Sequence, residues 1–221
     1  MLRKLFSGDH SSSKQASQRP SSSAGRIARH SSGWGQVLRH FKSGQNLRVL
    51  DIGPTSSNNI NYLTGLGHSI YMADLVEEAA NPRWVIPFVE GEPATYDAAG
   101  FIAEHMDFSG RTFDAVLLWD ALDFLPAPLA EPVVARIHEV TQPGALVLAF
   151  FHSPARDAAQ AARSYHRYHL TDEDLLQAQA VGSYPASPTY NNRAIEKLFT
   201  AYSSNKFLLA KDSMREVVVT R

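Results

Sequence analysis

The chain of 221 residues contains no cysteine. This absence excludes a disulfide framework, a thiolate nucleophile and a cysteine-ligated metal site. Long apolar runs are lacking too, because the longest one runs only from Ala145 to Phe151, far short of the ~20 residues that span a bilayer. The length suits one domain, or one domain with a tail. We therefore expect no membrane span and a cytoplasmic location.

Net charge is almost absent as well, at −1, but this average hides an asymmetry. Residues 1–46 carry eight lysines and arginines against a single acid, Asp9, whereas residues 47–221 carry 13 basic and 21 acidic side chains. The sequence therefore joins a basic N-terminal segment to an acidic globule.

Residues 1–33 are rich in serine and arginine. Such a segment cannot bury enough apolar surface to offset its chain entropy, so we expect a disordered tail here and one domain over residues 34–221. Three roles stay open for the tail. It is a solvated extension, a weak electrostatic contact with an anionic surface or nucleic acid, or an organelle transit peptide.

The remainder alternates between strand-like and helix-like segments, which favours a mostly parallel sheet covered by helices on both faces. Helical spacing of apolar residues predicts helices at 34–41, 58–66, 96–103, 129–140 and 192–202. Short β-rich or apolar runs predict strands at 47–52, 69–73, 104–108, 113–119 and 145–151. Two further strands, at 206–211 and 216–220, are joined by a tight turn and are therefore expected to be antiparallel.

Acidic residues follow the expected parallel strands. Ligands of open parallel sheets bind beyond the carboxyl ends of the strands, where this sequence places Asp51, Asp74 and Asp120. A dinucleotide would need G-x-G-x-x-G, but here Gly53 is followed by Pro54, and Asp51 would repel a diphosphate. S-adenosylmethionine (SAM) suits the site better, because it carries a sulfonium and an ammonium and has no phosphate. Its carboxylate can use the free N–H groups at the start of the next helix.

Four segments resemble the successive motifs of class I SAM-dependent methyltransferases. They are VLDIGP at 49–54, MAD at 72–74, FDAVLLWDALDFLP at 113–126 and QPGALVL at 142–148. The resemblance covers about residues 47–221. It implies an α/β fold with a Rossmann-like, doubly wound, mostly parallel sheet ending in an antiparallel strand, with SAM as the cofactor and methyl transfer as the reaction.

The resemblance also implies roles for individual residues. By their positions in the motifs, Asp51 and Gly53 bind the methionine end of the cofactor, and Asp74 binds the ribose hydroxyls. Asp107, after the expected third strand, lies near the adenine. Trp119 or Asp120 lines the side where the methyl group is transferred.

Methyl transfer needs alignment more than a catalytic residue, although a hydroxyl or ammonium acceptor must still lose a proton. His152, at the end of an expected central strand, is the best-placed candidate base. The segment 165–169 (YHRYH) is expected to be a lid or to line the substrate. If this segment is helical, His166 and His169 share a face, but no third ligand is evident and we expect no metal.

The alternatives stay open at this point. The loop after the first strand keeps only Gly53, where the family has two or three glycines, which favours a methyltransferase-like binding or scaffold module without activity. An NAD(P)-linked enzyme is a further alternative. The methyl acceptor, a small molecule or a macromolecule, cannot be read from the sequence.

Overall fold

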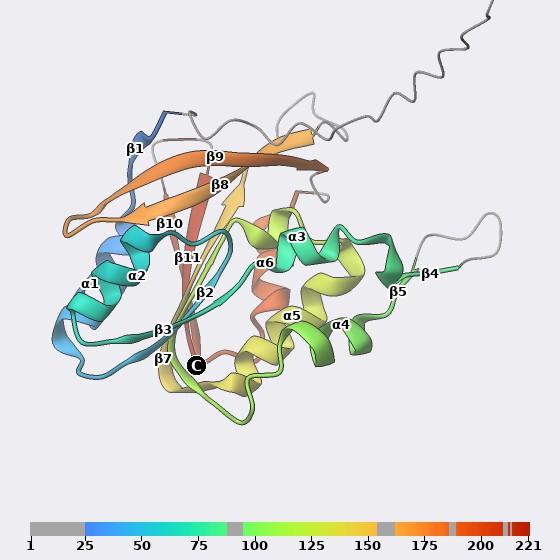
Figure 1. Ribbon diagram of the computed structural model, residues 1–221, viewed down its shortest axis with the longest axis horizontal. Coiled ribbons are helices and arrows are strands. Elements are labelled where there is room, and N and C mark those ends of the chain that lie inside the picture. Colours follow the sequence, from blue (N-terminus) through green and yellow to red (C-terminus); the bar gives the residue numbers. More distant parts are fainter. Residues whose placement is uncertain (1–24, 88–94, 154–161, 186–188, 210–211, 213) are drawn as a thin grey trace, which may run out of the picture.

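The computed structural model describes residues 25–87, 95–153, 162–185, 189–209, 212 and 214–221. Its main sheet consists of β2 (Arg48–Ile52), β3 (Ser69–Ala73), β6 (Phe113–Trp119), β7 (Thr141–His152), β10 (Ser204–Leu209) and β11 (Met214–Thr220). The strand order is β10-β11-β7-β6-β2-β3 (Figure 1). Strands β3, β2, β6 and β7 are parallel, and β11 and β10 are antiparallel to their neighbours. The expected mostly parallel sheet with an antiparallel end is confirmed.

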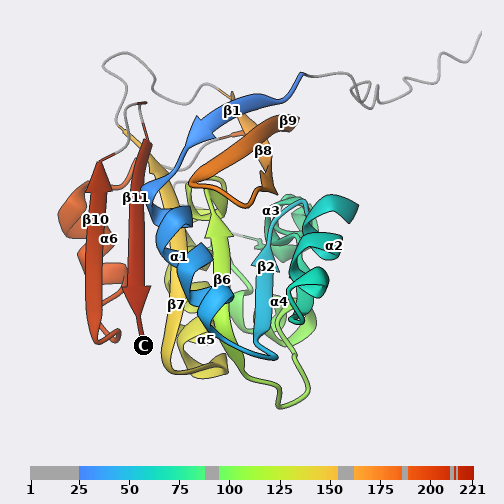
Figure 2. The ribbon, with the colours of Figure 1, turned by 90° about the vertical axis from the view of Figure 1, so that its left-hand side faces the viewer.

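Helices cover both faces of this sheet (Figure 2). On one face lie α1 (Ser32–Ser43) and α2 (Ser57–Gly65), and on the other lie α3 (Leu75–Ala79), α4 (Ala98–His105), α5 (Ala127–Val140) and α6 (Asn192–Leu198). Successive strand residues serve opposite faces: Val49 packs with α1, whereas Leu50 packs with the helices of the other face. This alternation explains why the central strands read as continuous apolar runs.

The strand expected at 104–108 is wrong. Glu104 and His105 complete α4, and the chain then turns towards β6. The helix extends this far because the buried ring of Phe101 packs against the rings of both Trp84 and His105. Before α4 lie a short helical turn, η1 (Pro82–Trp84), and two short paired strands, β4 (Val85–Ile86) and β5 (Thr95–Tyr96).

The ordered domain begins earlier than residue 34, because β1 (Ile27–His30) precedes α1 and Ser31 caps that helix. The sequence missed this strand because its basic side chains read as part of a solvated tail. In the fold Arg29 is only 8% exposed and pairs with Asp212 and Glu216. Residues 1–24, where most of the disorder was expected, lie outside the described residues.

A second sheet lies above the carboxyl ends of the main strands (Figure 2). It is formed by β1 together with a long hairpin of β8 (Ala162–Leu170) and β9 (Leu175–Pro185), in the antiparallel order β1-β9-β8. The segment 165–169 is therefore a strand and not a helix, so His166 and His169 point to opposite faces. Over the described ranges, no group of side chains could hold a metal ion, and no helix is long and apolar enough to cross a membrane.

Candidate functional site

The carboxyl edge of the parallel strands brings three carboxylates together. Asp51 is the penultimate residue of β2, while Asp74 and Asp120 directly follow β3 and β6. The chain runs from β2 outward to β3 and then returns to the other side of β2 as β6. The strand order thus reverses between β2 and β6, where ligands of such sheets bind. The expected position of these three residues at one edge is confirmed.

Asp51 is buried, with 1% of its surface exposed. Its Oδ1 accepts a 2.7 Å hydrogen bond from Nε1 of Trp119, whereas Oδ2 has no hydrogen-bond partner among the described residues. Burial raises the pKa of Asp51 to about 6, although Thr55, Trp119 and Asn59 lie near enough to oppose the rise. A buried carboxylate with one free oxygen attracts a cationic group, because pairing with a cation offsets its desolvation.

Gly53 opens the loop that follows Asp51. Its φ of +152° lies in a region that other residues rarely adopt. A Cβ atom at this position would lie 3.3 Å from the Tyr165 hydroxyl and 3.4 Å from Cδ1 of Trp119. The glycine therefore lets two aromatic side chains approach the loop, and Ser56 then caps α2 by accepting a hydrogen bond from the Asn59 backbone N–H.

Asp74 has two roles at the end of β3. Its side chain caps α3 through the backbone N–H of Glu77, and its Oδ1 accepts a hydrogen bond from the Tyr165 hydroxyl at 3.3 Å. Burial raises the pKa of Asp74. The Tyr165 hydroxyl thus occupies one side of the carboxylate that the sequence assigns to ribose.

Asp120 is fully buried at the end of β6. Its Oδ2 accepts a hydrogen bond from the Tyr168 hydroxyl at 3.1 Å, while Oδ1 has no hydrogen-bond partner among the described residues. The preceding residue, Trp119, has a φ of +48°, an unusual conformation for a bulky residue, and its ring stacks on Tyr168. Such strain gathers at functional sites.

Strand β8 supplies residues that the sequence did not assign individually. Tyr165 and Arg167 point to the side of Gly53 and Asp74, and Arg167 donates a hydrogen bond to the Pro54 carbonyl oxygen. His166 and Tyr168 point to the side of Asp120. The segment YHRYH indicated these residues, because its alternating side chains suit a strand that contacts different residues on its two faces. Only the fold shows which residues each face contacts.

The side chain of Asn59 holds β8 in place. In the first turn of α2, its amide donates to the Tyr168 carbonyl oxygen at 2.8 Å and accepts from the Leu170 N–H at 3.0 Å. Asn59 is 1% exposed, so both hydrogen bonds are shielded from water. The sequence indicates this residue only as part of a polar loop.

The candidate base His152 lies at the end of β7. Its Nδ1 is 2.8 Å from Oδ2 of Asp123, which is 1% exposed and lies in the short helical turn η2 (Ala121–Asp123) after β6. The same oxygen accepts the backbone N–H of His152. This pairing orients the imidazole and leaves Nε2 free for a proton, as a base requires.

Asp107 is not at this edge, so its expected place near the adenine is wrong. It precedes β6 in the chain and lies at the amino end of that strand, where its side chain accepts the Ser109 N–H in a turn. The error follows from the third strand that the sequence wrongly predicted, because Asp107 follows a helix and not a parallel strand.

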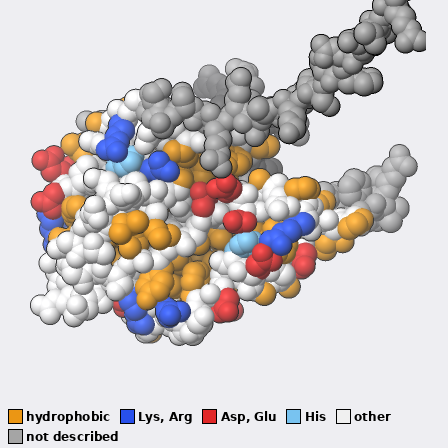
Figure 3. Space-filling model, in the orientation of Figure 1, with side chains coloured by type: hydrophobic (Ala, Val, Ile, Leu, Met, Phe, Trp, Pro, Cys, Tyr) orange, Lys and Arg blue, Asp and Glu red, His pale blue; other side chains and the backbone are white. Residues whose placement is uncertain are grey.

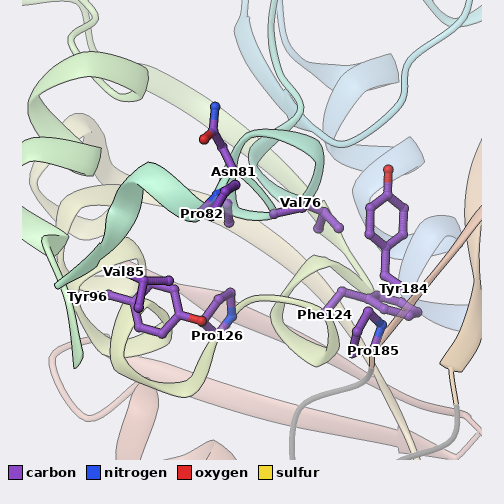
Figure 4. Close-up of a pocket in the computed structure, with 11 residues that line it drawn as sticks. Val76, Asn81, Pro82, Val85, Tyr96, Phe124, Pro126, Tyr184 and Pro185 are labelled. Carbon is purple, nitrogen blue, oxygen red and sulfur yellow. The ribbon is translucent and has the colours of Figure 1, made fainter. Parts of the chain in front are cut away.

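A cavity of about 430 Å³ lies beside α3, the helix that Asp74 caps (Figure 4). Val76 and Pro82 lie on one side of it, and Phe124 and Pro126 lie on the other. None of the described residues that line it is charged, so we call it the neutral cavity. Outside the cavity, acidic side chains gather over α3 (Figure 3), which carries Glu77 and Glu78.

Comparison with known proteins identifies the family. The model of the methyltransferase domain matches residues 25–202. The chain belongs to this methyltransferase family. It is a class I SAM-dependent methyltransferase whose cofactor is SAM, and this family membership favours methyl transfer over the binding-module and NAD(P)-linked alternatives.

Two solved structures of low sequence identity are similar to this methyltransferase. A SAM-dependent methyltransferase from Methanosarcina mazei is 12% identical over 83% of this chain and 96% of its own, with a TM-score of 0.50. The 1,6-didemethyltoxoflavin-N1-methyltransferase of Burkholderia thailandensis, solved with 1,6-didemethyltoxoflavin and S-adenosylhomocysteine, is 14% identical over 86% and 78% of the two chains, with a TM-score of 0.44. No curated protein matches the chain.

The residues at the carboxyl edge fit SAM. The cofactor carries a sulfonium next to its sugar and an ammonium at the methionine end, and the edge offers Asp51 with an unpartnered oxygen and Asp74 after the adjacent strand. The neutral cavity beside α3 suits an uncharged planar ring. The Tyr165 hydroxyl and the Glu77 N–H both bond Oδ1 of Asp74, so the hydroxyl is a side-chain group that a ribose would have to compete with.

Proposed function

We propose that the methyltransferase holds SAM along the carboxyl edge of β2, β3 and β6. The adenine occupies the neutral cavity, Asp74 takes the ribose hydroxyls, and Asp51 with the Gly53 loop takes the methionine end. Trp119 and Asp120, across the switch point, line the side of the methyl group. The observation that supports this arrangement is that Asp51, which is buried, and Asp74, which is partly buried, meet at the ends of adjacent strands, near an uncharged cavity lined by α3.

Bound SAM supplies an activated methyl carbon. The chain's own residues supply alignment, which can account for much of the acceleration, and exclusion of water by Trp119, Tyr165 and Tyr168, which are nearly fully buried. His152 stays the predicted base, oriented by Asp123. The cytoplasmic location and the contact of the basic tail with an anionic partner also stay predictions.

Calorimetry with the full chain tests the arrangement. SAM and S-adenosylhomocysteine are expected to bind, and NAD is not, because the loop after β2 lacks the glycines that a pyrophosphate needs. The absence of binding by both SAM and S-adenosylhomocysteine at millimolar concentration contradicts the proposal.

The substitution Asp74→Asn tests the ribose site within the same experiment. It keeps an oxygen that can cap α3 but removes the charge, so SAM affinity is expected to fall about tenfold, the scale of one charge-assisted hydrogen bond. Asp97→Asn is the matched control, because Asp97 caps α4 in the same way through the Gly100 N–H. Equal affinity of both variants for SAM contradicts the assignment of Asp74.

A further inference from the structure

A second and larger cavity lies on the other side of β8, outside the cofactor arrangement. Its volume is about 690 Å³, within the range of small-molecule sites. It lies beneath β1, between β9 and the start of β11. Apolar side chains provide much of its lining, namely Ile27, Ala28, Ala178, Ala180 and Met214. Gly25 and Tyr168 also line it, as do Arg29, His30, His166 and Asp212, so we call it the charged cavity.

The positive charge of Arg29 in this cavity is already paired with carboxylates. Arg29 donates hydrogen bonds to Glu216 at 2.6 Å and to Asp212 at 2.7 Å, and its guanidinium lies over the Phe150 ring at 4.6 Å from the centroid. Two carboxylates therefore neutralise one cation. The cavity does not suit a phosphate or a carboxylate, which would compete with Asp212 and Glu216 for Arg29. A neutral, mainly apolar molecule fits the lining.

One end of the charged cavity lies next to Asp120, the residue that the proposed function places on the methyl-transfer side. His166 and Tyr168 line it, and both meet Asp120: the Tyr168 hydroxyl donates to Oδ2, and His166 Nδ1 lies 3.8 Å from the same oxygen. The fully buried Oδ1 of Asp120 has no hydrogen-bond partner among the described residues. A histidine beside a buried carboxylate is thus exposed to the cavity, with the carboxylate positioned to stabilise the imidazolium.

The alternation of β8 connects this end to the cofactor side. Tyr165 and Arg167 face the Gly53 loop, and His166 and Tyr168 face Asp120, so the strand separates the two sites by the width of its own backbone. The negative charges of Asp51, Asp74 and Asp120 all act on the Tyr165 hydroxyl and, together with burial, raise its pKa. Asp120 therefore lies close both to the residues that line the charged cavity and to the residues assigned to the cofactor.

We propose that the charged cavity is the acceptor site and that it takes a neutral aromatic molecule with a phenolic hydroxyl, which His166 deprotonates. This inference rests on the proposed function. The proton of the hydroxyl passes to Nε2 of His166, and the oxygen lone pair forms the bond to the methyl carbon that SAM supplies. The electron pair of the broken carbon–sulfur bond stays on sulfur. The products are a methyl ether and S-adenosylhomocysteine, and Asp120 stabilises the imidazolium until solvent takes the proton.

A phenol is favoured over other acceptors on chemical grounds. Its hydroxyl ionises much closer to neutral pH than that of an alkyl alcohol, so an imidazole removes its proton more readily. Its ring finds apolar partners in Tyr168 and Met214.

Binding of p-nitrophenol to the full chain tests the site without turnover. The phenolate form absorbs visible light and the phenol form does not, so the spectrum reports the proton directly. At a pH just below the pKa of free p-nitrophenol, the bound fraction is expected to be enriched in phenolate, with S-adenosylhomocysteine present or absent. His166→Gln is expected to lower the bound phenolate-to-phenol ratio about tenfold, the scale of one charge-assisted hydrogen bond.

Three variants separate this site from the rest of the molecule. His30→Gln is the matched control, because His30 lines the same cavity but is half exposed and pairs with Asp174 instead. It is expected to keep the phenolate signal. Ala180→Trp is expected to fill the cavity and abolish p-nitrophenol binding while SAM binding, measured by calorimetry, is retained. The proposal assigns the base to His166 in place of His152, because His152 does not line this cavity. His152→Gln tests this choice between the two histidines, since only the variant of the true base loses the phenolate signal.

Each opposite result overturns the proposal. No p-nitrophenol binding, binding without phenolate enrichment, or loss of the signal in His152→Gln but not in His166→Gln each excludes His166 and this cavity as the acceptor site. Failure of SAM binding, in contrast, contradicts the proposed function and leaves the p-nitrophenol result readable by itself.

Discussion

The neutral cavity and the charged cavity lie on opposite sides of β8 and differ in where their charged residues lie. No described residue lining the neutral cavity is ionisable at neutral pH, whereas Arg29, His30, His166 and Asp212 line the other. On the cofactor side the charges lie beside the cavity, at Asp51 and Asp74, where they can meet a cation. On the acceptor side they lie within it, and the arginine is already neutralised. The difference suits a cofactor held by its charge and an acceptor held by its shape.

Removing the arginine of the charged cavity is expected to have the largest effect on stability. Arg29→Met leaves Glu216, which is 1% exposed, without its cation, so the free energy of unfolding is expected to fall by about 3–5 kcal/mol in urea denaturation. The exposed Arg26, which donates to Gln177, is the control, and Arg26→Met is expected to change stability by no more than about 0.5 kcal/mol. In the double variant Arg29→Met/Glu216→Gln, part of the loss is expected to be recovered. A loss below about 1 kcal/mol in Arg29→Met contradicts the buried ion pair.

An intermediate effect is expected on the cofactor side. The pKa of Asp51 is raised to about 6 in the folded chain, against about 4 when unfolded. Between these values the folded state binds more protons, so stability falls as the pH rises through this window and stays lowered above it. Asp51→Asn removes this cost, and urea denaturation is expected to show it about 2 kcal/mol more stable than the parent at pH 7 but not at pH 4.

The same substitution separates stability from binding. Because the uncharged amide no longer attracts a cation, Asp51→Asn is expected to bind SAM more weakly in calorimetry, although it is more stable. A variant that loses stability at pH 7, or that binds SAM as tightly as the parent, contradicts the view of Asp51 as a buried charge kept for the cofactor.

The smallest effect is expected on SAM affinity at Tyr165, a residue of the strand that separates the two cavities. Tyr165→Phe removes the hydroxyl that occupies Oδ1 of Asp74, so SAM affinity is expected to rise about threefold, within the range of one neutral hydrogen bond. Tyr62→Phe is the control, since that hydroxyl bonds Asp172 away from the edge. Weaker SAM binding in Tyr165→Phe indicates instead that the hydroxyl itself contacts the cofactor.

The sequence predicted the main sheet well, because its strands are local features bounded by turns. The runs 47–52, 69–73 and 113–119 each have an acid next to their last residue, namely Asp51, Asp74 and Asp120, and the parallel order alone places these acids at one edge. The failures have other causes. Strand β1 pairs with β9 across a long stretch of sequence, and Arg29 is buried only because Asp212 and Glu216 reach it from the other end of the chain. The roles of His166 and Tyr168 depend on Asp120, which only the fold brings next to β8, and Asp107 is misplaced because the segment before it forms a helix.

The pairing of β1 with β9 has a consequence for the order in which the molecule assembles. Ile27 aligns with Ala178, whereas Asp51 aligns with Met72 close by in the chain. Closing the longer loop costs more chain entropy, and contacts of high sequence separation form slowly. During synthesis the carboxylate edge can take shape from early segments, but the roof of the charged cavity must wait until the second half of the chain has emerged. The carboxylates therefore come together before either cavity is enclosed, because Tyr184 and Pro185 at the end of β9 also line the neutral cavity.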